Sequence, residues 1–128
     1  NTEMRKKTVS QLKKEAWKVF SKYIRTRDNF TCFTCGRKGN QAGHMISKHK
    51  GGSALYFHPE NVHCQCYFCN INLGGNGSVY SKRFIDEYSL ETFNKLHTLK
   101  DAGNIPWTSE RLQNIKDTYQ KKLEEFET

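Results

Sequence analysis

The 128-residue sequence lacks long apolar runs, and only 35% of its residues are hydrophobic. No run approaches the roughly 20 apolar residues that a membrane-spanning helix needs, so we expect no membrane segment and no membrane partner. The first residues are polar and basic and have no apolar centre of the kind found in signal peptides. We therefore expect a cytoplasmic protein whose small core is supplemented by a bound metal.

The sequence also lacks an even set of cysteines, because five is a poor fit to a secreted disulfide framework. Four of them form two Cys-x-x-Cys pairs separated by 30 residues, Cys32 with Cys35 and Cys66 with Cys69. Four thiolates satisfy a tetrahedral Zn²⁺ and leave no open position, so the pattern predicts a structural zinc site. Cys64 could replace one ligand in a Cys64-x-Cys66 pair, but it is more simply a small buried thiol.

Acidic residues are scarce in the first half of the chain. Residues 1–50 hold 13 Lys and Arg against 3 Asp and Glu, whereas residues 51–128 hold 8 against 10, within a net charge of +8. Concentrated positive charge favours a polyanionic partner, although a solvated basic helix is the alternative reading. The basic residues that we expect at a nucleic-acid backbone are Arg25, Arg27, Arg37, Lys38, Lys48 and Lys50.

The periodicity predicts a basic flexible arm over residues 1–9 and one domain over residues 10–128. A helix capped by Ser10 is expected up to about Arg27, because its apolar residues recur every three or four positions. Residues 40–47 and 53–58 are short extended stretches around a glycine turn and predict a two-stranded hairpin. Two helices follow, the second capped by Ser89, and a last helix begins at a cap formed by Thr108 or Ser109.

Other aromatic, histidine and apolar residues have expected structural roles. The aromatic side chains of Phe33, Tyr67 and Phe68 are expected to pack around the zinc rather than stack on bases. The imidazoles of His58 and His63 are expected to be exposed in loops. The apolar stripe of the last helix is consistent with a dimerisation surface or, equally, with packing on its own domain.

Several motifs occur in one order along the chain and together resemble the NinG/Rap family of phage recombination proteins, from Leu12 to about Leu99. The motifs are Ala16-Trp17, Phe20-Ser21, Tyr23-Ile24-Arg25, Arg27-Asp28, Cys32-x-x-Cys35-Gly36, Ala42-Gly43-His44, Pro59-x-Asn61, Gln65-Cys66-x-x-Cys69-Asn70, Gly75-Asn76 and Tyr80. The family belongs with the HNH, or ββα-metal (His-Me finger), nucleases, which include phage endonuclease VII. The resemblance implies an α+β fold in which a hairpin and a following helix hold the active site, with further helices at both ends.

The resemblance assigns roles to three residues. His44 matches the first HNH position, where the histidine is the general base that activates water. Asn61 matches the middle position, usually a structural asparagine that ties down the loop between the strands. Asn70 matches the third position, where an amide oxygen binds a divalent ion, Mg²⁺ or Mn²⁺, which stabilises charge on the phosphate and the leaving oxygen.

The sequence departs from the family pattern at Gly43. HNH enzymes commonly carry Asp or His there as a second metal ligand. Either the ion is held mainly by Asn70 and DNA phosphates, or His44 is itself a ligand and another group is the base. His49 is the best spare base, and Asn76 could contribute an oxygen.

The resemblance implies a structure-selective endonuclease for branched double-stranded DNA, such as Holliday junctions and D-loops, in the cytoplasm of the host cell. A phage recombinase is a possible partner, and a homodimer would supply the two incisions that a four-way junction needs. Three alternatives remain open: a non-catalytic zinc-knuckle DNA-binding protein, a general HNH nuclease, and an RNA-binding module.

Overall fold

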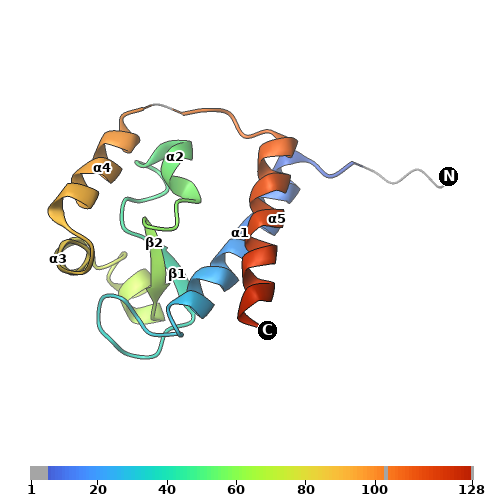
Figure 1. The fold of residues 1–128 in the computed structure, drawn as a ribbon. Coiled ribbons are helices and arrows are strands. Elements are labelled where there is room, and N and C mark those ends of the chain that lie inside the picture. The colour runs from blue at the N-terminus through green and yellow to red at the C-terminus, as the bar shows by residue number, and fades with distance from the viewer. Residues whose placement is uncertain (1–5, 103, 128) are drawn as a thin grey trace.

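The computed structural model describes residues 6–102 and 104–127, which form a mixed α+β fold with a small hairpin between two groups of helices (Figure 1). The fold class expected from the sequence is confirmed. In chain order the elements are α1 (Val9–Arg27), β1 (Gln41–His44), α2 (Gly52–Tyr56), β2 (Val62–Gln65), the π-helix η1 (Phe68–Asn72), α3 (Gly77–Glu87), α4 (Leu90–Lys100) and α5 (Ser109–Phe126).

Helix α1 buries one apolar stripe, as its periodicity predicted. The cap, however, is Thr8 rather than Ser10: the Thr8 hydroxyl accepts from the backbone N–H of Gln11, and the Gln11 side chain accepts from that of Thr8. This reciprocal capping box starts the helix two residues earlier than predicted. The flexible arm remains a prediction, because residues 1–5 lie outside the described residues.

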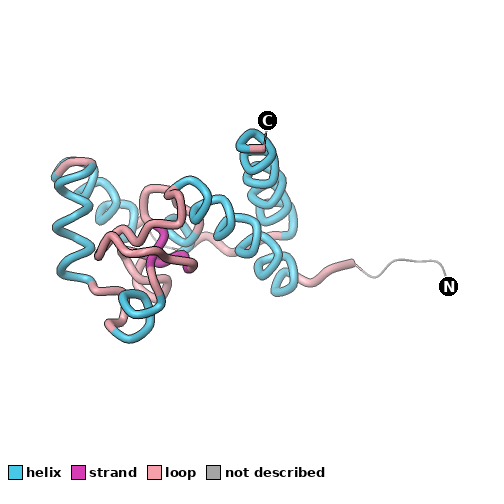
Figure 2. The backbone as a smooth tube through the Cα atoms, turned by 90° about the horizontal axis from the view of Figure 1, so that it is seen from below, coloured by secondary structure: helices cyan, strands magenta, loops and turns pink. Residues whose placement is uncertain are grey.

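Helix α5 runs alongside α1, and the two lie side by side in both views (Figures 1 and 2). The ring of Tyr119 packs edge-on against Phe20 at 4.7 Å between centroids, and Lys116 Nζ lies 2.7 Å from Glu15 Oε1. Thr108 caps α5, as predicted. The apolar stripe of α5 is therefore used within its own chain.

The hairpin pairs β1 with β2 antiparallel, with Gln41 opposite Gln65 and Gly43 opposite His63. The prediction that residues 53–58 form the second strand is wrong, because this stretch begins with helix α2. In an antiparallel pair, opposite residues share a face of the sheet. Gly43 and Gln65 thus face one side, while His44 faces the other.

Helices α3 and α4 pack on each other at the opposite side of the hairpin from α1, and Ser89 caps α4 as predicted. Their core is formed by Phe84 and Leu96 together with Ile46 and Leu55. None of the described helices is long and apolar enough to cross a membrane. Two helical pairs thereby hold the hairpin from both sides.

Candidate metal centre and active-site cleft

Four cysteines from both ends of the hairpin come together at one point. The sulfur atoms of Cys32, Cys35, Cys66 and Cys69 all lie within 4.8 Å of one another, and none forms a disulfide. Cys35 Sγ lies 3.7 Å from Cys66 Sγ. A tetrahedron with Zn–S bonds of about 2.3 Å has edges of roughly this length, so the donor set fits a structural Zn²⁺.

The thiols of this cluster are poised for a cation. Burial raises the pKa of Cys32, but hydrogen bonds from the Thr34 hydroxyl and from nearby backbone N–H groups outweigh it and lower that pKa to about 6. Burial and the crowding of neighbouring sulfurs raise the pKa of Cys35 to about 12. The positive charge of a bound cation would offset the repulsion among the negatively charged sulfurs. Metal binding therefore favours the deprotonated form of these thiols. Cys64 lies outside the cluster and is fully buried, as predicted.

A cleft of about 800 Å³ lies beside the hairpin and is lined by parts of α1, β1, the 47–49 turn, η1 and the segment after η1. It brings together His44, Gly43 and Asn70, which the sequence had placed in one site. Arg25 and Lys48 also line it, and no Asp or Glu does among the described residues. The cleft is therefore a positively charged hollow at the end of the hairpin.

His44 is held on two sides. Its ring stacks on Trp17 with centroids 5.1 Å apart, and Nε2 lies 2.9 Å from the backbone carbonyl of Tyr56. A carbonyl only accepts, so the neutral ring carries its proton on Nε2 and leaves Nδ1 able to take one. Burial lowers the pKa of His44, with a further reduction from Lys48, so the ring is a neutral base at neutral pH.

Asn61 is fully buried and joins two parts of the loop between the strands. Its Oδ1 accepts from the backbone N–H of Ile46, and its Nδ2 donates to the carbonyls of Ile46 and Leu55. These contacts match the structural role that the resemblance implied. Both the oxygen and the nitrogen of the amide are therefore bonded to the backbone of the loop.

Asn70 and Gln65 both direct amide oxygens toward Gly43. A β carbon built on Gly43 would lie 1.9 Å from Gln65 Oε1 and 2.9 Å from Asn70 Oδ1. Gln65 is fully buried on β2, and no functional role was predicted for it. The sequence does contain a signal for Gln65. It is a polar residue directly before Cys66, and position 43 has no acidic side chain of the kind that HNH enzymes carry there.

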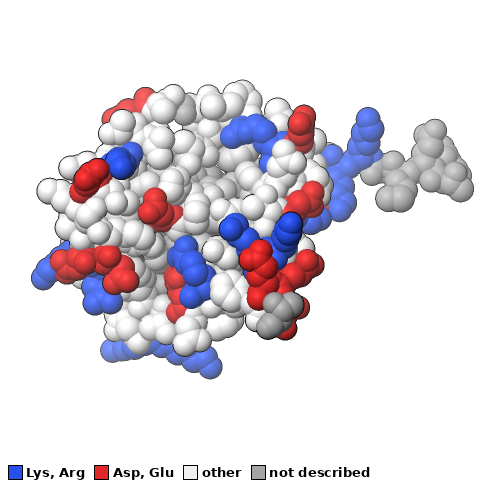
Figure 3. Space-filling view, viewed as in Figure 1, with Lys and Arg blue, Asp and Glu red and all other residues white. Residues whose placement is uncertain are grey.

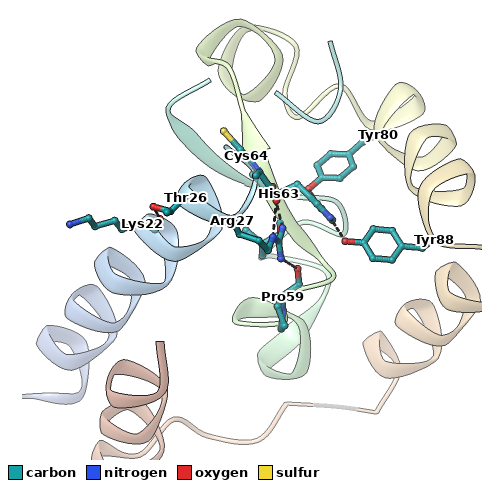
Figure 4. A network of polar contacts seen from close by, with 11 residues as sticks. Lys22, Thr26, Arg27, Pro59, His63, Cys64, Tyr80 and Tyr88 are labelled. Carbon is teal, nitrogen blue, oxygen red and sulfur yellow. Dashed lines mark hydrogen bonds and ion pairs between the residues drawn. The ribbon is translucent and has the colours of Figure 1, made fainter. Parts of the chain in front are cut away.

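A chain of hydrogen bonds reaches the backbone of Gly43 through Tyr80, His63 and Tyr88, whose side chains are labelled in Figure 4. The Tyr80 hydroxyl donates to the Gly43 carbonyl at 2.7 Å, so it accepts from His63 Nδ1 at 3.0 Å; His63 Nε2 in turn accepts from the Tyr88 hydroxyl at 2.7 Å. Burial lowers the pKa of His63 to about 3, which keeps this ring neutral. The expectation that His63 is an exposed loop residue is wrong.

The predicted DNA-contacting residues differ in how far their side chains are engaged within the chain. Arg27 is half-buried and engages Asp28 and the carbonyls of Pro59 and Val62, so its guanidinium is committed inside the molecule (Figure 4). Arg25 reaches the cleft but also donates to Asn40. The exposed members are Arg37, Lys38, Lys48 and Lys50. On the face drawn in Figure 3, basic and acidic side chains are interspersed, with basic ones along its lower edge.

The remaining candidate residues differ in whether they line the cleft and in what they contact. His49 is exposed and lines it, so it stays the spare base. Asn76 instead points its amide at Cys69 Sγ, 3.8 Å away. Phe33 stacks on His63, but Tyr67 and Phe68 are 60% and 50% exposed, so their expected packing around the zinc is wrong.

Fold and site together define a class: a small α+β protein in which four cysteines fix a hairpin beside a positively charged, histidine-containing cleft. The comparison with known proteins agrees with the family suggested by the sequence. The family model described as bacteriophage lambda NinG protein matches residues 2–128, and the chain belongs to this family.

The chain is similar to the proteins named ninG of Salmonella phage P22 and Escherichia phage lambda, with 29% identity over 117 residues to each. The ninG protein of Escherichia phage 933W is also 29% identical over 117 residues. The matches cover 88% of this chain but only 56–57% of those proteins, so the chain spans little more than half of their length. No solved structure matches it.

Proposed function

We propose that this phage protein is a metal-dependent DNA endonuclease that acts on branched DNA. The observation that carries the proposal is the state of His44: a neutral imidazole, held through Nε2 and by stacking, at the edge of a cleft to which the described residues contribute no carboxylate. A positioned neutral histidine is a general base suited to work near neutral pH. The NinG family places such a protein in a phage setting.

The chemistry is hydrolysis of a phosphodiester bond. A water oxygen forms the new bond to phosphorus, its proton passes to His44 Nδ1, and the bond from phosphorus to the leaving oxygen breaks. Arg25 and Lys48 attract and position the DNA backbone in the cleft. A bound Mg²⁺ or Mn²⁺ would stabilise the charge on the phosphate and the leaving oxygen, with Asn70 among its ligands.

The structural zinc site would position this machinery rather than react. Four sulfur ligands complete the coordination of Zn²⁺, so no position remains for water or substrate. Cys32 and Cys35 precede β1, whereas Cys66 and Cys69 follow β2. The ion would therefore clamp both ends of the hairpin that carries His44 and hold Asn70, the residue after Cys69, against it.

Branched DNA, with a Holliday junction or D-loop as the preferred form, is the substrate we propose on the strength of the family. A phage recombinase in the host cytoplasm would be the accompanying partner. Cutting a four-way junction on two strands needs two active sites, so we further propose a homodimer on the junction. Because α1 covers the stripe of α5, another surface would have to mediate it.

The test is cleavage of a labelled four-way junction and of a linear duplex with matched sequence, each with Mg²⁺, Mn²⁺ or EDTA. The proposal expects cutting that depends on the divalent ion and favours the junction. Equal cutting of both substrates would favour a general nuclease instead. Competition with single-stranded RNA in the same assay separates an RNA-binding module, and sedimentation of the junction complex reports whether two chains bind.

A second candidate is a DNA-binding protein that does not cut, and Gly43 is the observation that favours it. The position where related enzymes carry a metal ligand has no side chain here. Tight binding of the junction without incision under any divalent ion would select this candidate and reject the enzyme.

A further inference from the structure

The space beside Gly43 is filled by another residue. A β carbon at this position would lie 1.9 Å from Gln65 Oε1, which is closer than any real contact. Gly43 has no left-handed backbone conformation that would by itself require glycine. Glycine is therefore required here because the Gln65 amide occupies the place of a side chain at position 43.

The orientation of the Gln65 amide is fixed by its nitrogen. Nε2 donates to the Gly75 carbonyl at 2.9 Å and to Thr34 Oγ1 at 3.1 Å. Because a carbonyl cannot donate, the NH₂ group must face Gly75, and Oε1 must face Gly43. Gln65 Oε1 is the one buried side-chain oxygen or nitrogen among the described residues that has no hydrogen-bond partner.

A second amide oxygen points at the same place. Asn70 Nδ2 donates to Gln41 Oε1 at 2.8 Å, which leaves Asn70 Oδ1 on the Gly43 side, 2.9 Å from the position of the absent β carbon. Two carbonyl-type oxygens thus converge on one small volume, and a buried acceptor calls for a partner. Oxygen donors without N–H groups between them are what Mg²⁺ and Mn²⁺ prefer.

We infer that Gln65 Oε1 and Asn70 Oδ1 together bind a divalent cation, with Gln65 supplying from β2 the ligand that Gly43 cannot. The catalytic meaning of this site rests on the proposed function, but cation binding does not. Neither ligand is charged, so water and DNA phosphates complete the coordination, and binding without DNA is weak.

The zinc cluster orients this ligand. The Thr34 hydroxyl accepts from Gln65 Nε2 and lies 3.3 Å from Cys32 Sγ. With the hydroxyl proton directed to the Cys32 thiolate, its lone pairs face Gln65. The zinc site and the cation site are thereby joined through one hydroxyl, an outer-shell contact of the kind that fixes ligand geometry.

The test measures Mn²⁺ bound to zinc-loaded protein without DNA, from the loss of the free-ion EPR signal. Wild type is compared with Gln65→Ala, with Gln120→Ala as a surface control, and with the double variant Gly43→Asp/Gln65→Ala. The double variant removes the amide that blocks position 43 and places a carboxylate there. We expect Gln65→Ala to weaken Mn²⁺ binding about tenfold or more, the surface control to match wild type, and the double variant to regain binding.

A measurement on unmodified protein guards against variants that fold poorly. Mn²⁺ should broaden the side-chain NH₂ signals of Gln65 and Asn70 in NMR spectra before those of Gln120. Wild-type affinity in Gln65→Ala, or broadening that spares both amides, overturns the inference. Mn²⁺ binding through Gln65 without DNA cutting would reject the nuclease and support the cation site. Ion-dependent cutting that Gln65→Ala leaves unaffected would support the nuclease and reject Gln65 as a ligand.

Discussion

At the scale of single residues, the two histidines of the hairpin have different surroundings. His44 stacks on Trp17 of α1 and is bonded through Nε2, whereas His63 is enclosed by Phe33 and two tyrosine hydroxyls. The sequence alone marked His44 through its motif but gave no means to see that His63 is buried. That burial depends on α3, which is distant in the chain.

His63 makes stability depend on pH. Its pKa is about 3 in the folded protein against 6.5 ordinarily, because burial disfavours the charged ring. Between these values the unfolded chain binds a proton that the folded chain does not, so stability is full above pH 6.5 and falls as pH decreases toward 3. The loss is up to about 1.4 kcal/mol per pH unit.

The measurement is urea unfolding from pH 7.0 to 5.0, with zinc content checked at each pH. The variant His63→Asn keeps a donor for Tyr80 but does not titrate, so its stability should depend less on pH than that of wild type. Identical slopes for the two proteins would show that His63 is not the group responsible.

At the scale of elements, the sequence predicted the long helices well and the short strands poorly. Residues 53–58 were predicted as a strand because they follow the glycine turn at residues 51–52, but the chain forms α2 there. All four residues of β2 are buried, so buried and exposed residues do not alternate along it. Two of the four, His63 and Gln65, are polar, so the sequence does not look like that of a buried strand. Both segments pack against helices distant in the chain, α2 against α4 and β2 against α1, and a short segment does not encode such packing.

Asn61 holds the loop between the strands and should matter for stability rather than chemistry. Its Ala variant loses three buried hydrogen bonds, at about 1 kcal/mol each, so we expect roughly 3 kcal/mol lower unfolding free energy. Urea denaturation measures this. Asn94→Ala, on the exposed face of α4, is the matched control and should change stability by less than about 0.5 kcal/mol. Equal values for both variants would contradict the role assigned to Asn61.

At the scale of the whole molecule, zinc is expected to hold the two chain segments around the hairpin together. The spacing of the cysteines predicted the cluster, because two-residue pairs form compact knuckles wherever the intervening chain goes. The ligand Gln65 could not be predicted, since its position follows from the register of the hairpin and from close packing on Gly43.

We expect one zinc ion per chain and a substantial loss of thermal stability on its removal, because ion binding contributes directly to folding. Cys69→Ser should lose the ion, while Cys64→Ala, at a buried thiol outside the cluster, should retain it. Elemental analysis and thermal unfolding with and without a chelator check this. A Cys64→Ala protein that loses zinc, or a Cys69→Ser protein that keeps it at wild-type affinity, would contradict the ligand set.

The proposed nuclease depends on His44 as its general base. The most direct test compares wild type with His44→Ala for cutting of a labelled four-way junction in Mg²⁺, with zinc content and junction affinity measured on both. We expect ion-dependent cutting by wild type and a loss of about a hundredfold or more in the variant, with zinc content and junction affinity unchanged. Undiminished cutting by His44→Ala, or no cutting by wild type with any divalent ion, would contradict it.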